Sequence, residues 1–332
     1  MKRLIILGLL VSTVCGGLAA RSVTDMAGRT VEVPAIIDKI LPYDLKTAVL
    51  IFALAGDKMT ATPGLPGRKE MQYISKDFIG LPVVDVKHIE EVILLSPQVI
   101  ISGFYGSPVN KHSALTLGDR LGIPVLLIDL SIDRLDRAYE FLGRIFAMEK
   151  ESVPLVHFLK QLYTLADSLK KVHGPVKQTA YYALGAKGLL TDPAGSKHTE
   201  VLDMLCIPNA AKVGLPTGGH AQAGLEQVLL WNPDFIFASD FRGESSAYKL
   251  ITTDSKWSSI SAVKNHRVYK VPAQPMGWFD HPPSVNRIPG VIWLGSLFYG
   301  LDSRITREYI CRFYQLFYKY NLTETEYRLL FN

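Results

Sequence analysis

Residues 274–287, which read QPMGWFDHPPSVNR, bring together aromatic, acidic, imidazole and guanidinium side chains with three prolines. Trp278 and Phe279 could offer flat apolar faces to an aromatic or macrocyclic ligand. His281 could ligate a metal or donate a hydrogen bond, and Arg287 could pair with the oxygen donors of an anionic chelate. Because proline fixes φ, the loop should be rigid before anything binds. The stretch is therefore the first candidate for a ligand-binding site.

Two residues of this stretch have structural alternatives. Trp278 could pack against the apolar segment 288–299 that follows the loop. Asp280 could form an ion pair with Arg287 and hold the loop closed. The first alternative would take the indole out of the site, and the second would occupy the guanidinium that a chelate needs.

Further cationic and phenolic candidates lie in other loops. Arg68 is in the glycine- and proline-rich loop PGLPGRKE, where a solvated arginine is the alternative, and Tyr105 follows the apolar run 99–102. Lys197 comes directly after the loop TDPAGS. The cations favour an anionic chelate as the ligand, whereas the aromatic residues would suit a planar macrocycle equally well.

Three histidines of the second half, His198, His220 and His281, lie near predicted strand ends. Direct contact with a metal is conceivable for such a set, but no two of them have the spacing of metal ligands along one element. The first half offers only His88 and His112 between residues 21 and 131, which is few for a cage contributed by both halves. The sequence therefore predicts that the three histidines contact the ligand, with no metal site and no cofactor of the protein's own.

Composition and motifs exclude two classes of function. A net charge of +5 is spread over a chain with 20% charged residues, so no basic face for nucleic acid is indicated. The chain carries no nucleophile elbow, phosphate-binding glycine loop, HExxH motif or paired-carboxylate signature. We therefore expect a binding protein, with a secreted hydrolase as the alternative from another class.

The first twenty residues are typical of an export signal. Two basic residues precede the apolar segment 4–14, and small residues follow. We expect cleavage after Ala19 or Ala20 and a mature protein in the periplasm, because no other segment reaches the ~20 apolar residues of a membrane span. A lipid anchor on Cys15 is the alternative, but Val14 and its neighbours fit a lipoprotein signal poorly.

Cys206 and Cys311 remain after such cleavage. One disulfide between them is possible in an oxidising compartment. A chain of this size does not need one, so we expect two buried thiols that act as small apolar side chains.

Short apolar runs alternate with helical patterns along the chain, which indicates βαβ units and parallel sheets covered on both faces. A small β-hairpin is predicted over 23–33, and a helix over 152–172 would be roughly 30 Å long, enough to bridge two lobes. The predicted strands are 36–41, 82–85, 99–102, 125–128, 179–184, 235–238 and 268–271. The predicted helices are 46–55, 88–95, 114–121, 198–205, 225–230, 257–263 and 288–299.

Two segments repeat one scheme. Residues 89–101, IEEVILLSPQVII, and 225–237, LEQVLLWNPDFIF, both predict a helix, a proline and an apolar strand. Glu90 and Glu226 occupy the same place in each unit, in the first helical turn, where a carboxylate also favours the helix dipole. The chain is therefore predicted to be α/β, with two lobes that each carry a mainly parallel sheet flanked by helices. The expected divisions are a signal peptide 1–20, a lobe 21–131, connecting helices 132–174 with one long backbone helix, and a lobe 175–332.

The chain resembles the periplasmic substrate-binding proteins of ABC importers, in the class with a rigid helix between the lobes. The resemblance covers nearly all of the expected mature chain and is carried by VTDMAGRTVEVP, LEQVLLWNPDFIF, WSSISAVKNHRVYKVP and WFDHPPSVNR in this order. Two departures affect the expected pocket: Asp44-Leu-Lys where relatives often have small or hydroxyl residues, and Cys206-Ile-Pro in place of a usual glycine pair.

The resemblance implies capture of a ligand in a cleft between the lobes, with modest closure. It implies an iron–siderophore or related metal chelate as ligand, with cobalamin, haem or a bare metal ion as alternatives. It also implies a monomer that docks on a dimer of permease subunits, with Glu90 and Glu226 each meeting permease arginines.

Overall fold

The computed structural model describes residues 20–63, 71–106, 113–215, 220–239 and 247–331. It begins with an antiparallel hairpin of β1 (Ala20–Thr24) and β2 (Thr30–Pro34), as predicted. The buried Asp25 holds the turn, because its carboxylate accepts hydrogen bonds from Ala27 and Arg29 and pairs with the Arg29 guanidinium. The same carboxylate accepts a hydrogen bond from the Leu127 amide and so ties the hairpin to the first lobe.

The first lobe contains a parallel sheet of three buried strands in the order β3-β4-β5. The strands are β3 (Ile40–Pro42), β4 (Val99–Phe104) and β5 (Val125–Asp129). Its helices are α1 (Leu45–Ala55), α2 (Lys76–Gly80), α3 (Ile89–Leu95) and α4 (Ser113–Leu121). The strand predicted over 82–85 is wrong: Val83 forms only an isolated bridge with Thr62.

The second lobe contains a parallel sheet in the order β10-β9-β6 and a separate two-stranded antiparallel ladder. The parallel strands are β6 (Ala180–Ala183), β9 (Phe235–Ala238) and β10 (Val268–Lys270), and the ladder joins β7 (Leu190–Thr191) to β8 (Ala221–Gln222). Its helices are α7 (Glu200–Met204), α8 (Leu225–Trp231), α9 (Ala247–Thr253) and α10 (Ser261–Lys264). Four short 3-10 turns are described along the whole chain, before and within this lobe: Gly56–Lys58, Ile132–Arg134, Ser255–Trp257 and Val285–Arg287.

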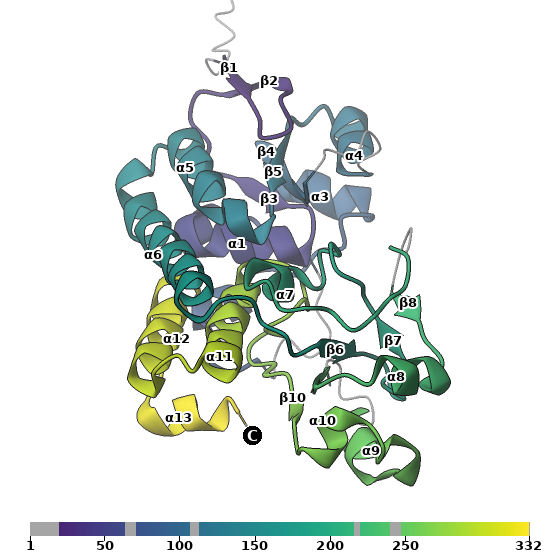
Figure 1. The fold of residues 1–332 in the computed structure, drawn as a ribbon. Coiled ribbons are helices and arrows are strands. Elements are labelled where there is room, and N and C mark those ends of the chain that lie inside the picture. Colours follow the sequence, from purple (N-terminus) through teal and green to yellow (C-terminus); the bar gives the residue numbers. More distant parts are fainter. Residues whose placement is uncertain (1–19, 64–70, 107–112, 216–219, 240–246, 332) are drawn as a thin grey trace, which may run out of the picture.

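A long helix connects the lobes, as the apolar periodicity predicts. After α5 (Leu135–Phe146), α6 (Glu149–His173) runs for 25 residues, about 37 Å at the helical rise. It packs against α5 on one side and against α11 (Ile288–Tyr299) and α12 (Ser303–Phe317) on the other. Figure 1 shows α6 at the left, with the two sheets placed above and below the middle of the molecule.

The repeated segments have the same structure in both lobes. Helices α3 and α8 each have seven residues and end at a residue in the left-handed conformation, Ser96 and Asn232. Each is followed by a proline that bars further helix and then by a buried strand. In Figure 1 both helices lie at the right, on the side away from α6.

The C-terminal segment was not predicted beyond residue 299. Helix α12 packs against α1 of the first lobe as well as against α6 and α11, and α13 (Glu324–Leu329) follows it. The end of the chain is therefore not confined to the second lobe, although the expected division at residues 175–332 placed it there.

The cysteines differ in part from the expectation. Cys206 and Cys311 are both free thiols, so they do not form a disulfide. Cys206 is exposed, and not buried as expected. It follows α7 and has the left-handed conformation, with φ of 52°. Glycine adopts this conformation without steric cost, which fits the glycine pair that the resemblance leads one to expect here. Within the described ranges, none of the helices combines the length and the apolar character that crossing a membrane requires.

Candidate functional site

The predicted rigid loop follows β10 and is tied down on several sides. The Gly277 amide donates a 3.0 Å hydrogen bond to the His281 carbonyl, and the Trp278 amide donates one of 3.0 Å to Pro272. The Ser284 hydroxyl donates a 2.6 Å hydrogen bond to the Lys46 carbonyl of the first lobe. The loop is therefore fixed at the junction of the two lobes.

Three histidines from separate segments meet beside this loop. His198 precedes α7, His220 precedes β8, and His281 belongs to the loop. The ring centroids of His198 and His220 are 4.8 Å apart, and those of His220 and His281 are 6.1 Å apart. No short sequence spacing could have indicated this, because the fold brings together positions that are up to 83 residues apart (281 − 198).

Asp280 is in contact with two of these imidazoles, those of His198 and His281. Its side chain is 1% exposed, and its oxygens lie 2.9 Å from His198 Nδ1 and 2.8 Å from His281 Nδ1. The His198 contact is an ion pair by distance and not a well-aligned hydrogen bond. The Tyr182 hydroxyl also donates a hydrogen bond to this carboxylate. Burial would raise the pKa of Asp280, but the contacts with His198 and His281 lower it well below its usual range.

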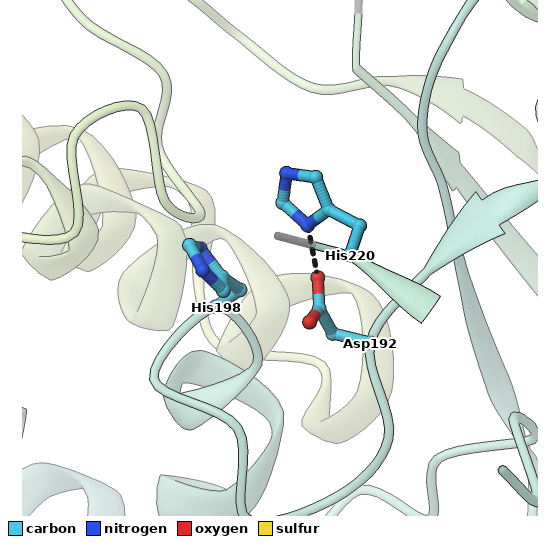
Figure 2. A group of neighbouring side chains, drawn as sticks. All are labelled: Asp192, His198 and His220. Atoms are coloured by element: carbon cyan, nitrogen blue, oxygen red, sulfur yellow. Dashed lines mark hydrogen bonds and ion pairs between the residues drawn. The ribbon is translucent and has the colours of Figure 1, made fainter. Parts of the chain in front are cut away.

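Asp192 is placed by the antiparallel pairing of β7 with β8. Thr191 pairs with Ala221, so the next residue, Asp192, lies beside His220. Its fully buried carboxylate is 2.6 Å from His220 Nδ1, as Figure 2 shows. This hydrogen bond raises the pKa of His220. Sequence reasoning missed Asp192 as a site residue, and its only signal was its position directly after a short strand.

The imidazoles are oriented in a common way. Each Nδ1 lies next to a buried carboxylate, whereas the side chains of His198, His220 and His281 remain 15%, 23% and 20% exposed. In a neutral imidazole, a nitrogen that donates to a carboxylate carries the single ring proton, and only in that state does the other nitrogen, Nε2, keep its lone pair. In Figure 2 the second nitrogen of His220 points away from Asp192. One donor atom from each of Asp192, His198 and His220 lies within 4.8 Å of the others, and the same holds for His220, Asp280 and His281. Such a set can bind a metal.

Arg287 does not occupy the position that the sequence indicated. Its side chain is fully buried and forms an ion pair with Glu200, and not with Asp280. Its guanidinium also donates to the carbonyls of Ser284, at 3.0 Å, and Leu130. It therefore joins both lobes as a structural clamp, and its full burial keeps it away from a ligand in the cleft. Burial raises the pKa of Glu200, and the Arg287 charge opposes that effect.

Trp278 and Phe279 are also not ligand contacts of the expected kind. Both are 0% exposed, so neither ring offers a face to a ligand. The Trp278 ring meets Trp293 of α11 edge to face, which is the alternative that the sequence had left open. Phe279 packs against Tyr182 and Phe237.

Tyr105 remains at the junction of the lobes. Its hydroxyl donates a hydrogen bond to the Pro283 carbonyl across the junction, and Lys197 Nζ lies 5.6 Å from the ring centroid. Burial raises the pKa of Tyr105 well above its usual value, so the phenol stays protonated. A hollow of about 450 Å³ opens here between the lobes. It is lined by residues that include Tyr105, Ser131, Arg134, Lys197, Glu200 and Asp203. Arg68 and His112 lie outside the described residues.

Glu90 and Glu226 occupy equivalent places in the first turns of α3 and α8. Both side chains are exposed, and neither has an ion pair or hydrogen bond with another residue in the described ranges. Neither caps its helix through its side chain, since the N-cap residues are His88 and Gly224. In the described part of the chain, a favourable interaction with the helix dipole is therefore the only structural role that we find for these two carboxylates.

Comparisons with known proteins agree with this architecture. The chain is 24% identical to the molybdate-binding protein MolA of Haemophilus influenzae, over 96% of this chain and 98% of that protein. Its fold is similar to an ABC transporter solute binding protein from Sulfurospirillum deleyianum, with a TM-score of 0.79 and 23% identity over 94% and 99% of the two chains. It is also similar to Helicobacter pylori CeuE with Ni(II) bound, with a TM-score of 0.65 and 15% identity over 94% and 100%. A model of the periplasmic binding protein family matches residues 43–275, and the chain therefore belongs to that family.

Proposed function

We propose that this protein is the extracytoplasmic substrate-binding component of an ABC importer, and that it captures a metal chelate at the junction of its lobes. One observation supports a metal-containing ligand: three imidazoles lie next to two buried carboxylates, Asp192 and Asp280. Imidazole nitrogens and carboxylate oxygens are both metal donors, and the negative charge of the two buried carboxylates favours a ligand that carries a metal cation over an oxyanion. The Ni(II)-bound CeuE, which shares the fold, supports a metal-containing ligand.

Docking on the permease is proposed to involve one helix from each lobe. Beside Glu90 and Glu226, each repeat exposes a leucine at an equivalent place: Leu94 is 83% exposed and Leu230 is 79% exposed. A single exposed leucine is ordinary, but two at matching positions of α3 and α8, helices that both lie away from α6 in Figure 1, favour a contact with a two-subunit partner. The glutamates would give the contact its orientation through bidentate pairs with arginine.

Charge reversal separates docking from ligand capture. In the double variant Glu90→Lys/Glu226→Lys, we expect uptake into cells to be lost while the affinity for the ligand stays unchanged, because both side chains lie on exposed helical turns. Uptake of a radiolabelled chelate and titration calorimetry on the purified variant measure the two quantities. The control is Glu151→Lys on α6, which is exposed on another face and should transport normally. Loss of affinity in the double variant would contradict the docking role.

The ligand is identified by native mass spectrometry of the protein purified from its own periplasm. A mass increase that contains a transition metal is the expected result. A molybdate adduct would contradict the metal-chelate proposal and would match what MolA binds. A corrinoid or haem adduct would select the macrocyclic alternative, which the full burial of Trp278 and Phe279 disfavours.

A further inference from the structure

The hollow at the lobe junction has the place and the size of a ligand site. Tyr105 and Gly106 directly follow β4, residues 131–134 come shortly after β5, and residues between 195 and 204 of the second lobe close the other side. Ligands commonly bind beyond the carboxyl ends of parallel strands. The volume of about 450 Å³ lies in the range of roughly 300–1,000 Å³ that is usual for small-molecule sites. The hollow is therefore large enough for the organic part of a small chelate.

Among the described residues that line this hollow, one cation has no carboxylate partner. Arg134 lies 3.2 Å from the Asp129 carboxylate, and Glu200 is paired with the buried Arg287. Lys197 is exposed, and its ammonium forms neither an ion pair nor a hydrogen bond with any residue in the described ranges. Lys197 is therefore the lining residue that can offer an uncompensated positive charge to a ligand.

The Lys197 side chain is positioned by contacts with both lobes. Its Nζ lies 5.6 Å from the ring centroid of Tyr105, whose hydroxyl donates a hydrogen bond to the Pro283 carbonyl. The backbone carbonyl of Lys197 accepts a 3.3 Å hydrogen bond from Arg287. A cation–π contact involves the face of the ring and leaves N–H donors of the ammonium for an anion. The ammonium is therefore held beside the hollow with donors that a negatively charged group can use.

Two acidic residues of the lining limit the charge of the ligand. Asp133 and Asp203 form no ion pair with the described residues, although Asp203 accepts a 2.9 Å hydrogen bond from the Gly195 amide. These side chains would repel a ligand with several free carboxylates. A single carboxylate joined to a metal or to an ammonium group would instead give each charge a partner. The lining therefore favours a group that carries one carboxylate next to a positive charge.

We propose that the Lys197 ammonium binds a carboxylate of the substrate's organic ligand in this hollow. The inference rests on the proposed function and narrows its substrate class to metal chelates with one such carboxylate, as an amino acid supplies. Lys197 directly precedes His198, one of the three clustered histidines, so the hollow borders the place proposed for the metal-containing part. Chelates without a carboxylate are then bound less tightly.

The test compares chelates that differ by one carboxylate. One pair is nickel with histidine and nickel with histamine, which lacks the carboxylate of histidine. The other pair is the ferric complexes of N-succinyl- and N-acetyl-desferrioxamine B, which have the same metal centre. Titration calorimetry on the full mature chain should show the carboxylate-bearing member of at least one pair bound about 10-fold more tightly. Lys197→Gln should remove this preference, whereas Lys197→Arg should retain most of it.

Lys256→Gln is the matched control. Lys256 is also exposed, but it lies in the 3-10 turn Ser255–Trp257 and not in the lining of the hollow. This variant should keep the preference of the wild type. The ratio of the two affinities within a pair is the informative quantity, because a general loss of stability weakens both members alike. Near-ultraviolet circular dichroism checks that every variant is folded.

The same preference in the wild type and in Lys197→Gln would overturn the inference, as would the absence of any preference or of any binding by the four complexes. If the metal complexes bind without preference, the proposed capture of a metal chelate stands. Binding of molybdate and of none of the four complexes would refute both the inference and the metal-chelate function. The failure of the inference can therefore be told from the failure of the proposed function.

Discussion

Replacement of Arg287 by methionine should destabilise the protein strongly. The guanidinium is fully buried and forms an ion pair with Glu200. It also donates hydrogen bonds to the carbonyls of Ser284, Lys197 and Leu130. Methionine fills a similar volume but leaves the Glu200 carboxylate without its countercharge. Removal of one partner of a buried pair costs about 3–5 kcal/mol. The Glu200 side chain is 20% exposed and so keeps some hydration, which puts the expected loss at about 3 kcal/mol.

Urea unfolding followed by tryptophan fluorescence measures this loss, because Trp278 and Trp293 are 0% and 7% exposed. The control is Arg304→Met, whose side chain is 93% exposed and which should change the free energy of unfolding by less than about 0.5 kcal/mol. The additional change Glu200→Gln in the Arg287→Met background should recover about 1 kcal/mol or more, since it removes the unpaired charge. If Arg287→Met lowers the free energy of unfolding by less than about 1 kcal/mol, Arg287 is not a structural clamp, and it becomes a candidate ligand contact again.

Two further predictions concern backbone constraints. Cys206→Val should lower the free energy of unfolding by about 1–2 kcal/mol while Cys206→Gly does not, because the residue has φ of 52°; equal urea midpoints for the two variants would contradict this. Gly290→Ala should cost about 2–3 kcal/mol, because a Cβ there would lie 2.2 Å from the Trp278 carbonyl oxygen. Gly80→Ala, where a Cβ would meet nothing within 4 Å, is the matched control, and a similar melting temperature for both alanine variants would refute the steric argument.

The sheets could be predicted from the sequence because their central strands are buried on both faces. Such strands read as continuous apolar runs, and the predicted runs 99–102 and 235–238 lie within or coincide with β4 and β9. The prediction was poorer at the start of the first strand of the first sheet. Ile36, at the start of the strand predicted over 36–41, is 67% exposed, and β3 begins only at Ile40.

The candidate site could be predicted only as a region. Ligand sites gather beyond the carboxyl ends of parallel strands. The place of the loop after β10, at the lobe junction, could therefore be predicted from its position directly after a strand. The direction of each side chain in an irregular loop has no sequence period, so Trp278 and Arg287 were expected in the cleft although both are fully buried. The gathering of the three histidines depends on the pairing of β7 with β8 and on the order of the second sheet, which are long-range properties.

The junction holds two kinds of buried ionic contact, one between an arginine and a glutamate and one between histidines and aspartates. Arg287 pairs with Glu200 and also donates to the carbonyls of Ser284 and Leu130, which suits a clamp between the lobes. Asp192 and Asp280 are instead paired with histidines, a residue type that can also bind a metal through a ring nitrogen. A buried carboxylate is costly without a compensating charge, and an arginine would compensate it more reliably. Histidine at all three positions is consistent with the proposed metal-containing ligand, whose positive charge would compensate these carboxylates when it binds.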